Sequence, residues 1–278
     1  MPELPEVETV RRGIERALPG STLNTVTLRR KDLRWPIPVR AVRGLRGRTL
    51  EATSRRSKYL CMHFTGPRRP IAMIHLGMSG RLWIDPADSG DLASWREHEH
   101  WRMDFGDLVL RYVDPRRFGM LDVVAANDFP DHKLIRNLGP EPLGESFHGE
   151  YLFAASRRRK VATKTFLMDA KNVVGIGNIY ASEACHMAGV RPRRAARRLS
   201  NRECHKLADA AREILSRAIA AGGTTIRDYI GVDEDTGYFQ RELMVYDRLG
   251  EPCRTCGTPI KRTIDTGRST FYCRSCQQ

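Results

Sequence analysis

Apolar and polar positions follow two different periods along the chain, and the change falls near residue 127. Between residues 22 and 126, short apolar runs are separated by Gly, Pro and Asp turns, with no long helical pattern between them. The runs expected to be strands are Thr22–Leu28, Tyr59–Phe64, Ile71–Leu76, Val109–Val113 and Leu121–Ala125. Because no helices separate these runs, the pattern predicts antiparallel sheets packed as a sandwich. Pro86 to Trp95 is expected to be a loop.

Helical spacing appears at the N-terminus and again in the second half of the chain. Pro5 suits the first position of a helix, Pro19-Gly20 ends the run, and the apolar positions between them are Val7, Val10, Ile14 and Leu18. Ile179–Met187 is expected to be a short helix. Ser200 to Glu203 is a capping box that opens a long helix ended by Gly222-Gly223. Its apolar positions are Leu207, Ala211, Ile214, Leu215 and Ala218. These patterns predict an α+β chain of several domains.

The charge balance indicates the class of partner. The 278 residues include 47 basic and 33 acidic side chains, giving a net charge of +14. Such a field attracts polyanions, nucleic acid first and an acidic membrane surface second. No apolar run approaches membrane-spanning length and no signal-peptide core is present, so a cytoplasmic or nucleoid protein is expected.

The cysteines predict a metal site. Cys61, Cys185 and Cys204 are isolated and are interpreted as small apolar core residues. Cys253-x2-Cys256-x16-Cys273-x2-Cys276 has the spacing of two knuckles that bind one Zn²⁺ with four thiolates. All four ligands come from the protein, which leaves no open position for water, so the zinc is expected to be structural.

Glycine-rich turns offer further candidate sites. The turn Thr266 to Thr270 would hold Arg268 at a rigid tip, where its guanidinium could bind a phosphate or simply be solvated. Val174 to Tyr180 is a glycine-rich turn into a helix, with Asn178 expected at the N-cap and the exposed amides there able to meet one phosphate. This stretch lacks the third glycine of a dinucleotide fingerprint, so NAD is rejected.

Two loop motifs combine bulky apolar side chains with polar or cationic ones beside glycines. They are His75 to Gly80 and Asp114 to Gly119. Such loops can wedge a base stack and fill the gap left by an extruded base. Taken alone, Met78 and Phe118 are more simply interpreted as anchoring the loops to the core. Lys58 follows a basic turn and should begin a strand.

The N-terminus carries a candidate nucleophile. Once Met1 is removed, Pro2 has a free secondary amine, whose pKa of roughly 8 leaves a neutral fraction near neutral pH. Glu3 brings a carboxyl group that could move protons, and the positive end of the following helix favours the uncharged amine. The alternative is that Pro2 is only a start residue in a disordered terminus.

Taken together, these motifs resemble formamidopyrimidine-DNA glycosylase, the bacterial base-excision family for oxidised purines. The resemblance runs end to end, and its motifs keep the family's order. They are Met1–Thr9, Arg56–Leu60, His75–Gly80, Asp114–Gly119, Leu138–Leu143, Gly175–Glu183, Gly222–Thr225 and the four-cysteine finger. The resemblance implies a catalytic β-sandwich domain over residues 1–126, a hinge over 127–142, a DNA-binding helix–two-turns–helix domain over 143–243 and a zinc finger over 244–278.

The resemblance also implies the chemistry. Pro2 would attack C1′ of a flipped-out nucleotide, the base would leave, and β,δ-elimination would cleave the strand. Glu3 would transfer protons at the sugar, and Lys58 would serve β-elimination and meet a phosphate. Arg268 would serve δ-elimination, physically more easily as a charge than as a proton donor, since guanidinium scarcely ionises below about pH 12. Further DNA contacts are implied for Glu6, His75, Met78, His98, Arg116, Phe118, Lys160, Asn178 and Thr224, among which Met78, Arg116 and Phe118 would fill the gap and wedge the duplex.

The partner implied is damaged double-stranded DNA, bound by a monomer with one structural zinc, no nucleotide cofactor and no membrane. Thr224 to Tyr238 corresponds to the family's flexible loop over the extruded 8-oxoguanine. That loop favours this activity over endonuclease VIII, the relative that acts on oxidised pyrimidines. Two hypotheses from different functional classes are a catalytically inactive binder of damaged DNA and a basic zinc-finger regulator. Neither explains why the chain has both Pro2 and Glu3.

Overall fold

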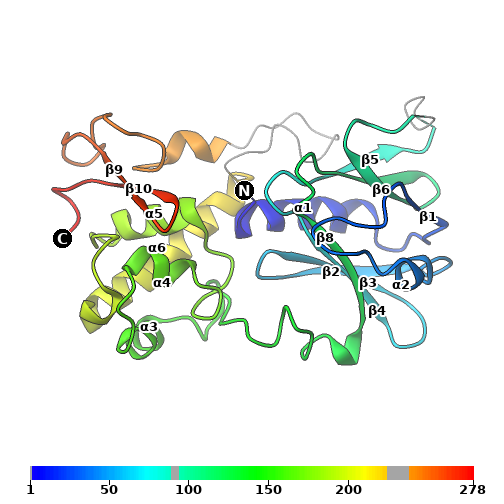
Figure 1. Cartoon of the computed structure of the whole chain (residues 1–278), viewed down its shortest axis with the longest axis horizontal. Helices are drawn as coiled ribbons and strands as arrows, with labels where there is room; N and C mark the ends of the chain where they lie inside the picture. The colour runs from blue at the N-terminus through cyan, green and yellow to red at the C-terminus, as the bar shows by residue number, and fades with distance from the viewer. Residues whose placement is uncertain (1, 89–93, 224–237) are drawn as a thin grey trace. The chain divides into compact units, whose positions relative to one another are not determined.

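The computed structural model describes residues 2–88, 94–223 and 238–278 (Figure 1). Its described residues form two compact units, which divide between Arg136 and Asn137. The first unit holds two four-stranded sheets with α1 and α2, and the second holds helices α3 to α6 and the C-terminal hairpin. No helix among the described residues is both long and apolar enough to cross a membrane.

The first unit is the predicted β-sandwich, with every neighbouring strand pair antiparallel. One sheet has the order β1-β6-β7-β5, made of Thr25–Leu28, Glu99–Asp104, Leu108–Val113 and Arg81–Pro86. The other has the order β2-β3-β4-β8, made of Leu50–Arg56, Tyr59–Phe64, Pro70–His75 and Met120–Ala125. Helix α1 (Leu4–Ala17) packs against β2 and β3, and the short α2 spans Val39–Arg43.

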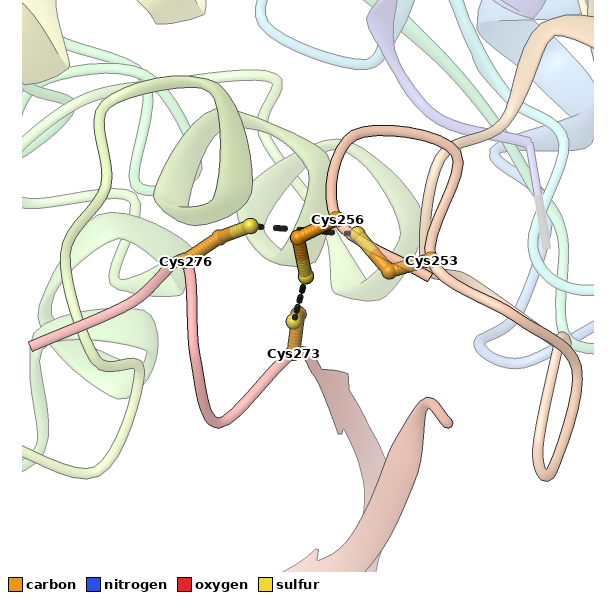
Figure 2. Close-up of side chains that lie close together, drawn as sticks. All are labelled: Cys253, Cys256, Cys273 and Cys276. Carbon is orange, nitrogen blue, oxygen red and sulfur yellow. Dashed lines mark hydrogen bonds between the residues drawn. The ribbon is translucent and has the colours of Figure 1, made fainter. Parts of the chain in front are cut away.

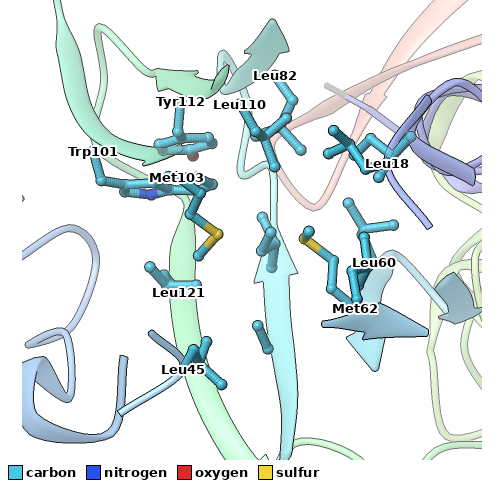
Figure 3. Close-up of a cluster of buried hydrophobic side chains, with 14 of the residues drawn as sticks. Leu18, Leu45, Leu60, Met62, Leu82, Trp101, Met103, Leu110, Tyr112 and Leu121 are labelled. Atoms are coloured by element: carbon cyan, nitrogen blue, oxygen red, sulfur yellow. The ribbon is translucent and has the colours of Figure 1, made fainter. Parts of the chain in front are cut away.

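The core of this unit is built from both sheets and α1 (Figure 3). Trp101 stacks on Tyr112 with ring centroids 5.1 Å apart, and Leu60 and Met62 contribute from the other sheet. The apolar stripe predicted for α1 is buried in the same cluster. Cys61 is also fully buried, and burial raises the pKa of its thiol to about 12, as suits an inert core residue.

Several boundaries differ from the expectations. The sequence pattern does not predict β2, β5 and β6, because their charged residues are typical of loops. Arg111 on β7 explains β5 and β6: it lies buried between Asp85 and Glu99, at 2.9 and 3.2 Å, so one cation pairs with a carboxylate on each neighbouring strand. β1 begins at Thr25, and α1 begins one residue before Pro5.

The expected loop from Pro86 to Trp95 is only partly described. Pro86 is the last residue of β5, and residues 89–93 lie outside the described part of the chain.

The second unit contains α3 (Gly149–Ser156), α4 (Thr163–Met168), α5 (Asn178–Met187) and α6 (Asn201–Ala220). Ser200 caps α6 through the predicted capping box, and Gly223 N donates to Ala218 O at 2.7 Å to close its end. Strands β9 (Lys261–Asp265) and β10 (Arg268–Tyr272) form the C-terminal hairpin. Short 3-10 segments lie at Ala126–Asp128, Ala196–Arg198 and Tyr238–Glu242. Cys185 and Cys204 are buried in this unit's core, as expected.

Candidate nucleic-acid interface and zinc centre

One end of the β2-β3-β4-β8 sheet gathers the predicted site residues of the first unit. The strand register pairs Arg56 with Tyr59, Tyr59 with His75, and His75 with Met120. The Ser57-Lys58 turn, the end of β4 and the start of β8 therefore lie in one row. The loops that follow β4 and precede β8 both emerge at this end of the sheet.

Helix α1 brings Pro2 and Glu3 toward the same end. Glu15 accepts a hydrogen bond from Thr53 N at 2.6 Å, and Glu8, earlier in the helix, pairs with Arg55 at 3.2 Å. Moving toward the N-terminus of α1 therefore means moving along β2 toward the Ser57-Lys58 turn. The start of the helix lies near the turn that carries Lys58.

The α1 N-terminus is closed by a capping box that uses two glutamates. Glu3 is the N-cap, its carboxylate accepts from the Glu6 backbone, and Glu6 Oε2 accepts from Glu3 N at 2.8 Å. Both side chains are almost fully buried, and Pro2 is buried too. Glu6 was expected to contact DNA; the structure finds its carboxylate in this cap, and the DNA contact stays a prediction.

His75 is held as a neutral hydrogen-bond donor. Its Nδ1 accepts from Gly77 N at 2.9 Å, and its ring lies 5.1 Å from that of Tyr59. Burial lowers the pKa of His75 to about 4, with the positive charges of Lys58 and Arg34 acting in the same direction. A neutral imidazole that accepts at Nδ1 carries its proton on Nε2, which suits donation to a phosphate oxygen.

The two loops are joined through the buried carboxylate of Asp114. Its Oδ1 accepts from Ser79 Oγ at 2.6 Å, and its Oδ2 accepts from Gly119 N at 2.8 Å and Tyr112 OH at 3.1 Å. Ser79 Oγ in turn accepts from Arg116 N at 3.3 Å. One charge therefore fixes the loop after β4 against the loop before β8.

Glycines allow these loops to approach each other. A Cβ at Gly77 would lie 2.4 Å from the carbonyl carbon of Phe118, and one at Gly119 would lie 1.6 Å from Tyr112 OH. Gly77 also has a φ of +67°, which favours glycine. Larger residues at either position would force the loops apart.

Met78 and Phe118 do not anchor these loops to the core. Each side chain remains 42% exposed, and the Arg116 guanidinium stacks 4.8 Å above the Phe118 ring. The simpler interpretation from sequence, in which both side chains are buried anchors, is therefore wrong. His98 is also exposed, has a φ of +59° and pairs with Glu97 at 3.2 Å.

In the second unit, Asn178 is not the N-cap that the sequence predicted. The extended backbone of Gly177 makes it the N-cap, so Asn178 is already the first residue of α5. Asn178 Nδ2 lies 3.4 Å from Tyr246 OH, and Tyr246 packs edge-on against Phe271 of β10 at 5.2 Å. Asn178 Oδ1 is buried with no hydrogen-bond partner among the described residues, so this amide has capacity for a further partner.

Arg268 is exposed at the start of β10, directly after the tight turn formed by Thr266 and Gly267. The positive φ values of these two residues, +49° and +74°, suit a two-residue hairpin turn. Lys164, a buried cation that sequence reasoning missed, donates to Ser269 O at 2.7 Å and to Thr270 Oγ1 at 2.9 Å. It fixes the strand that carries Arg268, and only the tertiary contact reveals this.

Lys160 belongs to a basic surface of the second unit. Segment 157–160 lies beside segment 191–198, because Arg197 N donates to Arg159 O at 2.9 Å and Ala162 bridges to Ala195. The exposed cations of these segments are Arg157, Arg158, Arg159, Lys160, Arg191, Arg193, Arg197 and Arg198. This concentration suits a polyanion.

The four predicted cysteines form the metal centre (Figure 2). Their sulfur atoms all lie within 4.8 Å of one another, with Cys253 and Cys276 at 3.9 Å and Cys256 and Cys273 at 3.5 Å. Tetrahedral zinc with Zn–S bonds of about 2.3 Å requires sulfur separations of about 3.8 Å. The residues therefore fit one Zn²⁺.

Nearby donors favour the thiolate at Cys256 and Cys253, whereas burial raises the pKa of the Cys273 thiol and the neighbouring Cys256 raises the pKa of Cys276. Hydrogen bonds from the Thr258 hydroxyl and backbone lower the pKa of the Cys256 thiol to about 6. Burial opposes ionisation of Cys253, but the backbone N–H groups of Thr255 and Cys256 outweigh it and lower its pKa. Metal binding needs these thiols deprotonated.

Comparison with known proteins identifies the family. Three family models match successive parts of the chain: the formamidopyrimidine-DNA glycosylase N-terminal domain at residues 1–121, its H2TH domain at 138–230, and a zinc finger found in FPG and IleRS at 250–278. The formamidopyrimidine-DNA glycosylases of Cellvibrio japonicus and Thiobacillus denitrificans are each 48% identical to the chain, with both chains fully covered. The chain belongs to the formamidopyrimidine-DNA glycosylase family.

Solved members of this family share the fold over the whole chain. A Lactococcus lactis FPG mutant, crystallised with DNA containing Fapy-dG, has a TM-score of 0.90 at 33% identity and full coverage of both chains. The Lactococcus lactis Fpg bound to DNA containing an abasic site has a TM-score of 0.89 at 32% identity and 99% coverage of both chains. Thr224, which the resemblance placed among the family's DNA contacts, lies outside the described residues.

Proposed function

We propose that this protein is a bifunctional DNA glycosylase and AP lyase that excises oxidised purines from duplex DNA. The observation that carries the proposal is the full-length match to enzymes solved with Fapy-dG and abasic-site DNA. The basic composition and the basic surface around Lys160 support a DNA substrate. We keep the division into residues 1–126, 127–142, 143–243 and 244–278 as a prediction.

In the first step, the neutral Pro2 amine attacks C1′ of the damaged nucleotide. The new C–N bond forms as the glycosidic bond breaks, the base leaves with a proton, and a cationic imine remains on the opened sugar. The positive end of the α1 dipole favours the uncharged amine, and the Glu3 and Glu6 carboxylates that cap the same helix end act in the opposite direction. The Glu3 carboxyl group, oriented by its capping role, exchanges the proton at the sugar.

The imine makes strand cleavage possible. Its positive charge acidifies the C2′ hydrogen, and loss of that proton expels the 3′ phosphate. Lys58 moves the proton, and the Nε2–H of His75 holds a neighbouring phosphate. Arg268 stabilises the 5′ phosphate as it leaves in the second elimination, and Asn178 binds a further phosphate through its amide group.

Access to the nucleotide requires opening of the base stack. Met78 and Phe118 have the exposed apolar surface that a wedge needs, and Arg116 has donors suited to the orphaned base. The Asp114 contacts keep the two loops in one arrangement, so the wedge would be largely formed before DNA binds. His98 and Lys160 are proposed as backbone contacts. The zinc has four protein ligands and takes no part in the chemistry.

Borohydride trapping tests the proposal. The unmodified protein should become covalently attached to a duplex that carries 8-oxoguanine opposite cytosine, while Pro2→Gly and Glu3→Gln lose most of the product. Glu145→Gln, at an exposed glutamate of the second unit, is the control and should trap normally. If the unmodified protein gives no trapped complex, the Schiff-base mechanism is wrong. Preferential trapping on a thymine glycol duplex would instead assign the endonuclease VIII specificity.

A further inference from the structure

The zinc centre has a neighbour outside the finger that none of the predicted site residues includes. His186, one residue before the end of α5, is buried, and its Nε2 lies 3.6 Å from Cys253 Sγ. Nothing in the CxxC spacing indicates such a partner, since His186 and Cys253 are 67 positions apart.

His186 is not a fifth ligand of the metal. Among the described residues, the four sulfurs form the group whose ligand atoms are mutually within 4.8 Å, and the imidazole lies outside that group. The four thiolates already complete the tetrahedral arrangement of a structural zinc site. The imidazole therefore touches one ligand from its outer side.

The chemistry of the pair fixes the direction of the hydrogen bond. A zinc-bound Cys253 sulfur has no proton to give and can only accept. An imidazole can carry a proton on Nε2 in either its neutral or its charged form, so it can serve as the donor in both. The hydrogen bond therefore runs from Nε2–H of His186 to the thiolate.

We propose that His186 is an outer-sphere positioning residue of the zinc site, which orients Cys253 and partly compensates the charge of its thiolate. Four thiolates around one Zn²⁺ leave a net charge of −2, so donors to sulfur stabilise the bound metal. Cys253 already receives two backbone N–H groups from the knuckle, and His186 adds a donor from the helical part of the unit.

This contact also fastens the finger to α5. Earlier in the same helix, the Glu183 carboxylate accepts from the backbone N–H groups of Met244, Val245 and Tyr246 at 2.8, 3.0 and 2.8 Å. Asn178 at the start of α5 reaches Tyr246 as well. The segment that leads into the finger is thus held along the length of α5, and His186 forms the last of these contacts, on the metal ligand itself.

The test compares His186→Phe, which removes the donor but keeps an aromatic ring, with His186→Gln, which restores an N–H donor. Transfer of zinc from the intact protein to a chromogenic chelator should be 10- to 100-fold faster for the phenylalanine variant, in about the range found for outer-sphere partners of metal ligands. The glutamine variant should return most of the way to the unmodified rate. His205→Phe, at a surface histidine paired with Glu150, is the matched control and should not change the rate.

A spectroscopic measurement separates the hydrogen bond from simple packing. In the cobalt-substituted protein, the sulfur-to-metal charge-transfer band should shift in His186→Phe and return in His186→Gln, because the donor withdraws charge from the sulfur. Unchanged zinc transfer and an unchanged band in the phenylalanine variant would overturn the proposal. Equally fast transfer from both variants would also overturn it, since the role would then be packing. The assay does not depend on glycosylase activity.

Discussion

The Asp114 carboxylate allows the most quantitative test of how the two loops that carry Met78 and Phe118 are held together. It is fully buried and accepts from Ser79, Tyr112 and Gly119. In Asp114→Ala the two hydroxyls can rotate toward other acceptors, but the buried Gly119 N–H cannot. One orphaned backbone donor costs about 1–3 kcal/mol, and loss of the charge-assisted bonds raises the expected total to about 3–5 kcal/mol.

Asp114→Asn should cost less, for a geometric reason. Its remaining oxygen can still accept from Tyr112 and Gly119, and its NH₂ group can donate to Ser79 Oγ. Ser79 Oγ would then accept from this NH₂ group as well as from Arg116 N. Because the NH₂ group cannot accept, the Ser79 hydroxyl hydrogen must find another acceptor. We expect a loss of about 1–2 kcal/mol, close to one net hydrogen bond.

Urea unfolding followed by tryptophan emission reports the free energy of unfolding of the first structural unit, which contains Asp114. All four tryptophans lie before residue 102, in the first unit, and Trp101 stacks on Tyr112 beside the site. With a slope of about 2 kcal/mol per molar urea, the alanine variant should lower the midpoint by about 2 M. Asp128→Ala removes an exposed pair with Arg68 and should change it by less than about 0.5 M. If the two alanine variants unfold at the same urea concentration, the carboxylate does not hold the loops.

Three further predictions concern a buried carboxylate, a partly buried histidine and the basic surface. Glu183→Gln should speed hydrogen exchange of the amides at 244–246 at least tenfold, because one amide oxygen cannot serve three N–H donors; mass spectrometry measures this. The ring protons of His75 should show no titration by NMR above about pH 5. The unfolded chain binds the proton more readily than the folded one, so this histidine contributes stability that is complete above about pH 6.5 and lost as pH falls toward 4. Replacing Arg158, Arg197 and Arg198 with Gln should make binding to undamaged duplex DNA less dependent on salt. The slope of the log binding constant against log salt concentration should fall in magnitude by up to about 3, because each phosphate that is no longer neutralised removes about 0.9.

Each of these predictions has a control. Exchange at 244–246 in Glu145→Gln should match the unmodified protein, and equal exchange in the Glu183 variant would show that the carboxylate is dispensable. A His75 titration near pH 6.5 in the folded protein would contradict its assignment as a neutral donor. Replacement of Arg40, Arg43 and Arg46, exposed around α2, changes the net charge by the same amount. If it reduces the salt slope equally, the effect is one of net charge and not of the surface at 157–160 and 191–198.

The local features of this protein could be predicted from its sequence. The zinc ligands follow from CxxC spacing, because two residues separate the partners within each knuckle. The capping box at Ser200 and the apolar stripe of α1 were predicted for the same reason, since both depend on neighbours within one or two helical turns. The short apolar runs without intervening helices predicted the β-sandwich, and the resemblance to the glycosylase family added the order of the domains.

What only the tertiary structure decided are the partners of buried polar groups. The charged residues of β5 and β6 are typical of loops in the sequence, and only the structure shows that Arg111 pairs with them. Nothing local in the sequence connects His186 to Cys253, Lys164 to Ser269 or Asp114 to Ser79. A charged or polar side chain has the same sequence signal whether it is solvated or paired in the interior. Burial makes an unpaired charge so costly that a partner must exist, but which residue supplies it depends on how distant strands and helices meet.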